Sequence, residues 1–381
     1  MMDEFDWTAE RTKSTWIFRE VEFPSMKELG NYDIIKGGSG ELSALSDMKM
    51  TGTLEVDGGT LNELNLLRVL YYCENALGQK TKEIPVATYF IQMPEPVSRA
   101  TNQGQRISGQ VNCTSTLSVL KDKLLHEPLV LPKGTPAVFL CMDMIAECSL
   151  PYERRSDTSY VTGRDREYQE GTPYLEVIND LLDLAGFRAL YPDEYGTLIL
   201  EKYVSPFSAD SVFTFERGEN AIHMRDIAFS SNYRETPTTI IGSYSADTYK
   251  IISVADNIDQ NSPSSLPNRG NRRKEEWHQI EELTATTKEE QIAEVERETV
   301  STLKANSSSI QHKEIKNLFV PVVRPNKVIT LIDQGINFTG AVTNVSINYG
   351  ANALCTTKAR SIVKYDLQIY KDTKFYGDFH A

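Results

Sequence analysis

The sequence lacks an excess of positive charge and any long apolar run. Its 381 residues hold 53 acidic and 40 basic side chains, so the formal net charge is −13. Phosphates repel an acidic chain, which argues against a general nucleic-acid-binding protein. No run of eighteen apolar residues occurs, so the sequence predicts no membrane-spanning helix. The acidic, polar N-terminal residues also lack the pattern of a signal peptide.

Cysteine is scarce and irregularly spaced. The five cysteines are odd in number and scattered, which is typical of reduced thiols in a protein made in a cytoplasm. Cys141 and Cys148 fall on one expected helix, about 10 Å apart. That separation suits neither a disulfide nor a metal site, so packing in a core is the better interpretation.

The common catalytic and cofactor motifs are also missing. The sequence contains no Gly-x-Gly-x-x-Gly, Walker, His-Glu-x-x-His or Gly-x-Ser-x-Gly pattern. The glycine-rich residues 37–40 lack the lysine of a phosphate-binding loop, so we expect a flexible turn there. The acidic pairs Asp180 with Asp183 and Glu281 with Glu282 fit charged helix surface better than a glycosidase site. We therefore expect no catalytic residue, no cofactor and no metal ligand.

The composition is otherwise that of a folded chain. Apolar residues make up 40% of the sequence and charged residues 24%, which excludes a largely disordered protein. The length is sufficient for two or three hydrophobic cores.

The first part of the chain is rich in predicted strands. They cover residues 16–23, 34–36, 51–57, 66–73, 84–92 and 106–112. The clearest alternation is in 51–57, where Thr53, Glu55 and Asp57 face one way and Leu54 and Val56 the other.

Helices are predicted in the middle of the chain. A short helix carries Leu117, Leu120 and Leu124, and an apolar, buried helix covers 137–147. A helix followed by a hairpin is predicted over 173–201. Gly-Thr-Pro precedes each of the last two helices, where threonine caps a helix well and proline suits its first turn.

The last part returns to strands. A hairpin is expected at 238–244 and 248–255, and strands at 327–332, 340–348 and 358–369. Between them, residues 256–284 form a long polar loop, which is usually functional or disordered. Thr286 or Thr287 then begins a helix over 287–305, because Glu289 and Glu290 complete a capping box.

The order of these elements resembles that of tailed-phage tail hub or baseplate hub proteins. This family includes the N-terminal region of tail-associated lysins and the hubs of contractile injection systems. Four features support the resemblance. They are the strand-rich start that closes near Asn112, the Leu131–Pro136 segment, the helix and hairpin over Pro173–Glu201, and the closing pattern of Val320–Leu331 with Phe338–Val345.

The resemblance implies an α+β, mainly β fold. Two tail-tube-like antiparallel β-barrel domains are expected, with an intervening helix-plus-hairpin domain, assembling as a trimeric ring. The corresponding segments are 1–113, 114–231 and 232–381. The implied function is that of a structural virion protein, not an enzyme. Such a hub joins the sixfold tail tube to the threefold tail tip and forms part of the channel for DNA passage.

The resemblance also implies partners and a location. The expected partners are two further copies of the chain in a homotrimer, the distal tail or tail tube ring, and the tape measure protein. Because the sequence stops soon after its last strands, a tip fibre, spike or hydrolase is expected as a separate chain. DNA is expected to contact the lumen only transiently, and no stable membrane binding is expected. The location is the virion tail, after synthesis in the bacterial host cytoplasm.

Two sets of residues are candidates for functional surfaces. Thr53, Glu55 and Asp57 are candidates for the lumen wall. The loop residues Arg272, Arg273, Lys274 and Trp277 are candidates for contact with a partner, since Glu275 and Glu276 make nucleic acid a poorer fit.

Two alternative functions stay open. One is a tail-tip peptidoglycan hydrolase, which needs a cleft with convergent carboxylates or a metal. The other is a receptor-binding tip protein that uses Trp277, Tyr244, Tyr249 and the loop 256–284.

Overall fold

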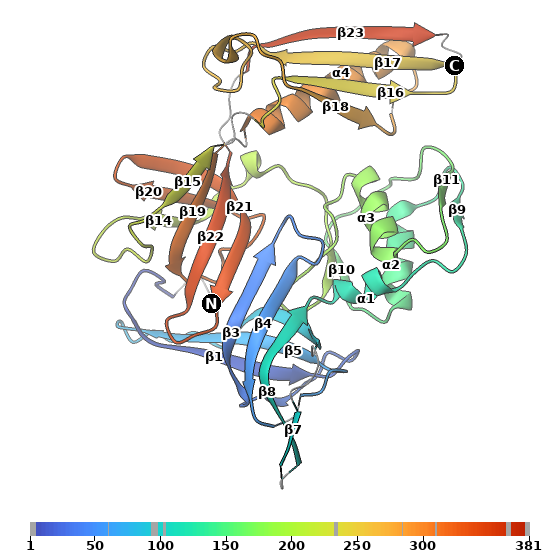
Figure 1. Cartoon of the computed structure of the whole chain (residues 1–381). Helices are drawn as coiled ribbons and strands as arrows, with labels where there is room; N and C mark the ends of the chain where they lie inside the picture. Colours follow the sequence, from blue (N-terminus) through green and yellow to red (C-terminus); the bar gives the residue numbers. More distant parts are fainter. Residues whose placement is uncertain are drawn as a thin grey trace. The chain divides into compact units, whose positions relative to one another are not determined.

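The chain folds into two compact units, each described here by itself (Figure 1). Unit 1 comprises Met1–Ile227 and Glu314–Ala359, and unit 2 comprises Ala228–Lys313 and Arg360–Ala381. The computed structural model describes residues 5–59, 61–92, 98–101, 104–231, 235–283, 285–308, 311–362 and 367–377. Residues 314–359 of the third predicted segment thus belong to unit 1. The division into three domains stays a prediction.

Most of unit 1 is a large β-sheet built from both ends of the chain. Its N-terminal strands are β1 (Arg11–Val21), β2 (Glu28–Asn31), β3 (Ile35–Ser43), β4 (Met50–Asp57), β5 (Leu66–Asn75), β6 (Ile84–Gln92), β7 (Ser98–Thr101) and β8 (Gly104–Thr114). Its later strands are β14 (Ser211–Glu216), β19 (Gln311–Leu318), β20 (Val328–Asp333), β21 (Ile336–Asn348) and β22 (Leu354–Ser361), whereas β15 (Ala228–Ser231) falls within the residues of unit 2.

One antiparallel strand pair joins the two sets of strands. The order runs β19-β22-β21-β3-β4-β8-β6-β5-β1-β2, with β20 and β14 branching from β21. Strand β21 pairs with β3 from Asn344 opposite Ser43 to Asn348 opposite Ser39. Strands β19 to β22 of the second predicted tube-like domain therefore share one continuous sheet with the strands of the first.

The prediction of two β-barrels is confirmed only in part. The fold is mainly β, but the described strands form an open sheet with no closed barrel. Pairing is also not wholly antiparallel, because β14 runs parallel to β20. An alternating sequence identifies strands and their buried faces. Closure of a sheet into a barrel depends on which edge strands pair with each other, and local periodicity gives no information on that pairing.

A single hydrophobic core lies under both sets of strands. Trp16 of β1 packs against Tyr71 of β5, with ring centroids 4.7 Å apart. The same indole contacts Phe319 at 5.3 Å and Tyr349 at 5.0 Å, which come from the C-terminal part of the chain. Aromatic pairs at these separations contribute beyond their buried area. The two halves of the sheet are therefore stabilised together.

The glycine-rich residues 37–40 form part of strand β3, so the prediction of a flexible turn is wrong. The glycines are there because atoms approach closely. A Cβ on Gly40 would lie 2.0 Å from the Tyr349 hydroxyl oxygen, and one on Gly38 would lie 2.3 Å from the Thr53 carbonyl oxygen. The strand thus needs residues without side chains where neighbouring atoms reach over it.

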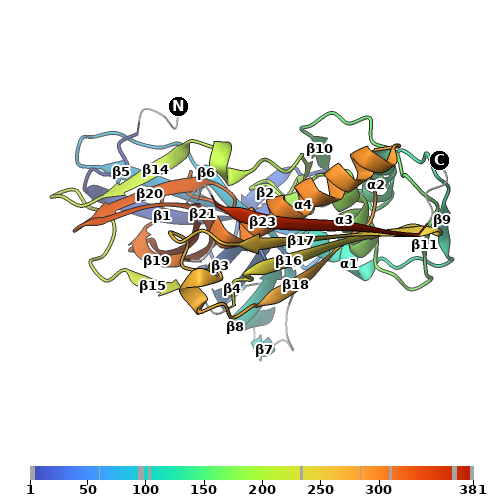
Figure 2. The same ribbon diagram turned by 90° about the horizontal axis from the view of Figure 1, so that it is seen from above.

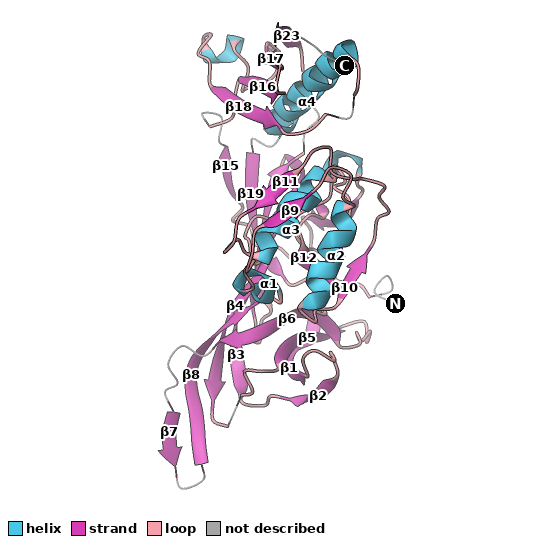
Figure 3. Cartoon of the chain, turned by 90° about the vertical axis from the view of Figure 1, so that its right-hand side faces the viewer, coloured by secondary structure: helices cyan, strands magenta, loops and turns pink. Residues whose placement is uncertain are grey.

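The helical part of unit 1, shown in Figure 3, has a hydrophobic core of its own. Its helices are α1 (Leu117–Asp122), α2 (Ala137–Glu147) and α3 (Tyr174–Leu184). Short strands accompany them, namely β9 (Leu129–Leu131), β10 (Tyr152–Arg154), β11 (Arg166–Tyr168), β12 (Tyr191–Pro192) and β13 (Leu198–Leu200).

The predicted helix and hairpin are confirmed in this region. Helix α3 buries Val177, Ile178, Leu181 and Leu182, and β12 pairs with β13. Helix α2 is less enclosed than predicted, because Phe139 keeps 46% of its surface exposed and lies beneath the Arg154 guanidinium. The Pro residues, not the preceding threonines, occupy the N-cap positions of α2 and α3.

Unit 2 is a four-stranded sheet with one helix on one face (Figure 2). Its elements are β16 (Thr239–Ser245), β17 (Tyr249–Asn257), β18 (Glu275–Ile280), α4 (Lys288–Ser308) and β23 (Ile369–Gly377), in the sheet order β18-β16-β17-β23. The helix buries Val295, Thr299 and Leu303 against the sheet.

Two segments of unit 2 differ from the predictions. The stretch 256–284 is not one loop, because it contains β18 and a short turn of 3₁₀ helix at Pro267–Arg269. Several of its polar residues are buried, and the Asn257 amide donates to the hydroxyls of Ser262 and Ser264. The predicted strand 358–369 is the end of β22 and the first residue of β23, while residues 363–366 lie outside the described residues.

The capping box of α4 allows a direct test. The Thr287 hydroxyl accepts from the Glu290 amide at 3.4 Å and donates to the Glu290 carboxylate at 2.8 Å. We expect Thr287→Ala to destabilise unit 2 by about 1 kcal/mol, because one amide at the helix start loses its acceptor. Hydrogen exchange of the first turn of α4 should report this loss. Thr286→Ala is the matched control, and an equal effect from it would contradict the assignment of Thr287 as the cap.

Candidate functional site: an acidic polar face of the sheet

The candidate site begins with the alternation of strand β4. Leu54 and Val56 are buried beneath the sheet, whereas Glu55 and Asp57 are exposed on its other side and Thr53 is half-buried there. The prediction that Thr53, Glu55 and Asp57 share one polar face is therefore confirmed as local geometry. Whether this face lines a lumen stays a prediction.

Neighbouring strands extend this face on both sides. Thr53 lies opposite Ser39 of β3 and opposite Asn112 of β8, while Ser39 lies opposite Asn348 of β21. The next row along is Ser346, Glu41, Thr51 and Thr114. These rows form a hollow of about 490 Å3 on the surface. We call the set Ser39, Glu41, Thr51, Thr53, Glu55, Asp57, Asn112, Asn344, Ser346 and Asn348 the polar face.

The polar face carries negative charge and neutral hydrogen-bonding groups. Its charged members are Glu41, Glu55 and Asp57, and it contains no lysine or arginine. The Asn344 amide donates a hydrogen bond to the Glu41 carboxylate, which ties β21 to β3. Lys36 lies at the irregular end of β3, and its ammonium bonds to the Asp33 carbonyl at 3.0 Å. Phosphates passing over this face would meet no cation among its members.

Sequence reasoning found only part of the polar face. Ser39 and Glu41 were not predicted to lie on a strand face, because the glycine-rich stretch shows no hydrophobic alternation. Asn344 and Ser346 do alternate with Val345 and were predicted within a strand, but nothing local shows that this strand lies beside β3. The register of distant strands was the missing information.

The structure accounts for most of the predicted partner-contact residues through contacts within the chain. Arg273 forms an ion pair with the buried carboxylate of Asp256 at 2.7 Å, and Lys274 pairs with Glu235 at 2.5 Å. Arg272 is exposed. Trp277 is 53% exposed on β18, beneath the Lys250 ammonium at 5.2 Å. A contact of Arg272, Arg273, Lys274 and Trp277 with a partner stays a prediction.

The aromatic residues of the receptor-binding alternative do not form one surface. Trp277 pairs with Ile241, so it faces the side of the sheet away from α4. Tyr244 and Tyr249 lie on the other side, in the core beneath the helix. The structure therefore separates Trp277 from the two tyrosines.

A buried ionic cluster in unit 1 was missed. The Asp333 carboxylate lies 2.9 Å from Arg217 Nη1 and 3.0 Å from His223 Nε2, and Asp333 and His223 are buried. Burial by itself raises the pKa of Asp333, but hydrogen bonds and charges from Arg217 and His223 outweigh it and lower the pKa. The three residues are far apart in sequence, so no spacing pattern could have indicated them.

Among the residues that the structure describes, no group of three or more His, Cys, Asp or Glu side chains is arranged to hold a metal ion. Asp180 belongs to one of the two acidic pairs. Its carboxylate accepts a hydrogen bond from the Tyr168 hydroxyl at 2.5 Å and lies 3.5 Å from Arg166 Nη1. No described helix is long and apolar enough to cross a membrane.

The fold is one found in bacteriophage and prophage tail proteins. The chain is similar to the tail protein from Neisseria meningitidis MC58, with a TM-score of 0.62 and 10% identity, over 91% of this chain and 97% of that one. It is also similar to the 43 kDa tail protein of prophage MuSo2 from Shewanella oneidensis, with a TM-score of 0.58 and 12% identity, over 90% and 97% of the two chains. The prophage tail protein gp18 from Listeria monocytogenes EGD-e gives a TM-score of 0.50 at 11% identity, over 90% and 94%.

These structures confirm the resemblance to tail proteins at the level of the fold. Because the identities are low, the likeness extends to the fold alone. It agrees with the expected location in a virion tail. No protein-family model matches the sequence, and no curated protein matches it significantly.

Proposed function

We propose that the chain is a structural protein of a phage tail, and more narrowly a subunit of the tail hub. Three copies would close a ring between the sixfold tail tube and the threefold tip, with the polar face lining the passage for DNA. The observation that carries this proposal is the polar face itself. It is continuous over strands from both ends of the chain, within a fold shared with tail proteins.

The charge of the polar face suits a passage for DNA. Glu41, Glu55 and Asp57 repel phosphates, and the serine, threonine and asparagine side chains around them stay hydrated. A wall of one sign keeps a polyanion from adhering as it moves past. The same chemistry would serve poorly as a site that holds nucleic acid.

The edges of the sheet support assembly with further copies. Strand β2 is the last strand at one end of the sheet, and among the described strands it pairs with β1 alone. An unpaired strand edge is a template for pairing with another chain, and a closed ring removes such edges. In this proposal the neighbouring copy covers that edge, and the tube ring, the tape measure protein and a separate tip chain bind above and below.

Electron microscopy of the purified protein tests the proposal. We expect ring-shaped particles with threefold symmetry and a central hole, alone or when mixed with tail tubes. Mass measurement by light scattering should give three chains per particle. A protein that stays monomeric at high concentration and does not bind tail tubes would refute the hub assignment.

Charge reversal on the polar face tests its role. We expect the triple variant Glu41→Lys, Glu55→Lys, Asp57→Lys to bind short double-stranded DNA with a Kd in the range of about 10⁻⁴–10⁻⁶ M, typical of nonspecific binding. The wild-type protein should show no shift in the same gel assay. The control carries the same change of charge at Asp122, Glu127 and Glu170, which are exposed in the helical region. Equal DNA binding by both variants would show that the polar face has no special role.

A further inference from the structure

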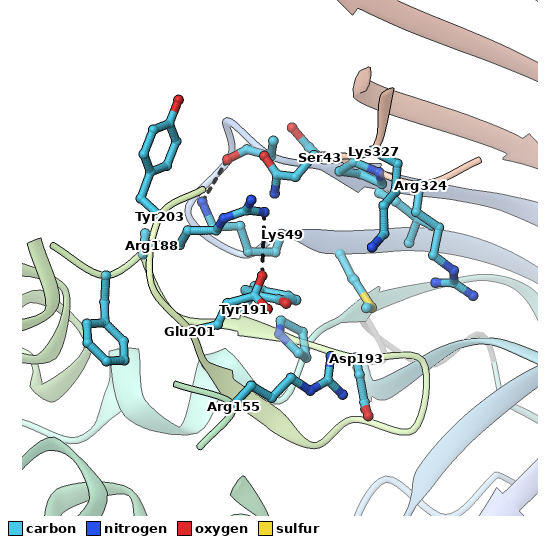
Figure 4. A pocket seen from close by; sticks show the side chains of 18 of the residues that line it. Ser43, Lys49, Arg155, Arg188, Tyr191, Asp193, Glu201, Tyr203, Arg324 and Lys327 are labelled. Atoms are coloured by element: carbon cyan, nitrogen blue, oxygen red, sulfur yellow. Dashed lines mark hydrogen bonds and ion pairs between the residues drawn. The ribbon is translucent and has the colours of Figure 1, made fainter. Parts of the chain in front are cut away.

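A second cavity in unit 1 has a different chemical character from the polar face. It has a volume of about 610 Å3 and lies where the turn between β3 and β4, the hairpin after α3 and the approach to β20 meet (Figure 4). Such a volume is typical of ligand pockets. Leu42, Met50 and Phe187, which are almost fully buried, provide an apolar part of its lining.

The lining of this cavity carries more positive than negative charge. Five cationic and four acidic side chains line it, in a chain whose net charge is −13. Arg155 pairs at 2.8 Å with Glu153, which does not line the cavity. The remaining cations that an anionic group could meet there are Lys49, Arg188, Arg324 and Lys327.

The lining carboxylates of the hairpin already have partners. Glu201 bonds to the Tyr191 hydroxyl and lies 3.5 Å from Arg188. Asp193 accepts hydrogen bonds from the amides of Tyr195 and Thr197, both at 2.9 Å. Glu194 lies 3.9 Å from Arg324. These acids stabilise the hairpin and its cations.

Two of the cations, Lys49 and Arg188, can donate further hydrogen bonds. Lys49 donates to the Ala44 carbonyl at 2.9 Å, but no carboxylate of the described residues lies within ion-pair distance of its ammonium. Burial lowers the pKa of Lys49, and the negative charge of nearby Asp47 opposes this shift only in part. The Nε of Arg188 is buried and has no hydrogen-bond partner among the described atoms. An oxygen-rich anion in the cavity would satisfy both groups.

We propose that this cavity binds an acidic peptide segment of a partner protein, with a carboxylate accepting hydrogen bonds from Lys49 and Arg188. The apolar lining would receive a neighbouring aliphatic or aromatic side chain of the same segment. The charged and apolar parts of the lining together suit a peptide in which acidic and apolar residues alternate, better than a small anion alone. Ring formation is not required for this binding, so the proposal stands apart from the hub assignment.

Selection from a displayed library of random nonapeptides provides the test. The full-length protein is the bait, and a Lys49→Asn, Arg188→Gln double variant is used for counter-selection. Asparagine suits position 49 because that residue has a φ of 59°, a left-handed conformation that asparagine tolerates. Enriched peptides are then measured by fluorescence anisotropy on each single variant. Lys202→Gln, an exposed lysine beside the cavity that does not line it, is the control.

We expect enriched peptides to carry Asp or Glu next to an apolar residue. Each single variant should weaken binding about tenfold, which corresponds to about 1.4 kcal/mol, whereas Lys202→Gln should not. A peptide with Gln and Asn in place of its Glu and Asp residues should bind the wild-type protein about as weakly as the acidic peptide binds each single variant. Glutarate, a small dicarboxylate, should compete only at far higher concentration than the peptide. Thermal unfolding of each variant checks that its fold is retained.

Three results would overturn the proposal. They are the absence of acid-bearing peptides among the enriched sequences, equal binding to the wild type and to both single variants, and glutarate binding as tight as that of the peptide. The first two would refute an anion site, and the third would identify a small-molecule site instead. None of them bears on whether three copies form a ring.

Discussion

Replacing Gly40 by alanine is expected to lower the free energy of unfolding of unit 1 by about 3 kcal/mol. The new methyl group would lie 2.0 Å from the Tyr349 hydroxyl oxygen and 2.8 Å from that of Tyr89. Both tyrosines are fully buried, and their hydroxyls share a hydrogen bond of 3.0 Å. The methyl group must therefore displace one ring and break that bond. Urea unfolding followed by tryptophan fluorescence measures the loss, because Trp16 packs against Tyr349.

Two control variants test whether the loss of stability in Gly40→Ala comes from the contact with Tyr349. Gly218→Ala places its methyl group in open space and should change stability little. Adding Tyr349→Phe to Gly40→Ala removes the oxygen that the methyl group meets, so the double variant should recover part of the lost stability. If Gly40→Ala and Gly218→Ala behave alike, the close packing of Tyr349 over β3 is incorrect.

Replacing Asp333 by asparagine is expected to cost about 2–3 kcal/mol near neutral pH. The change leaves Arg217 and His223 without their shared carboxylate in a buried site. Because the pKa of Asp333 is lower in the folded protein, its contribution is fully present above the ordinary pKa of about 3.9. It is lost as the pH falls through the lower, folded pKa.

The stability difference between wild type and Asp333→Asn should therefore narrow in acid. Urea unfolding at a series of pH values from neutral to strongly acidic measures this difference directly. Asp122→Asn, at an exposed carboxylate in the helical region, is the matched control and should show little effect at any pH. A difference that stays constant into strong acid would show that Asp333 acts through packing and not through its charge.

The sequence predicted those parts of the fold whose signals are local. Helix α3 and its hairpin have a strong amphipathic pattern, and α4 has a capping box, so both were predicted close to their observed bounds. The failures were of two kinds. Residues 37–40 looked like a turn because the tyrosines that require glycines there come from positions 89 and 349. Strand β18 looked like a loop because its partner β16 runs parallel to it and lies some distance back along the chain.

The candidate surfaces were predictable to different degrees. The polarity of Thr53, Glu55 and Asp57 followed from simple alternation, since each faces away from Leu54 and Val56. The extension of that face onto β3, β8 and β21 depends on pairing between distant segments, which no local rule provides. The cationic cavity was not predicted for the same reason, because Lys49 and Arg188 come from separate elements with no common motif.

The junction between β3 and β21 has a consequence for how the chain is made. Ser43 pairs with Asn344, and all of unit 2 except its C-terminal part lies between them in the sequence. At ribosomal rates of about 5–20 residues per second, roughly 15–60 s pass between synthesis of the two residues. During that interval the nascent chain carries an uncovered β-edge at β3. Chaperone binding during translation, or slow growth at low temperature, should therefore strongly affect the yield of soluble protein.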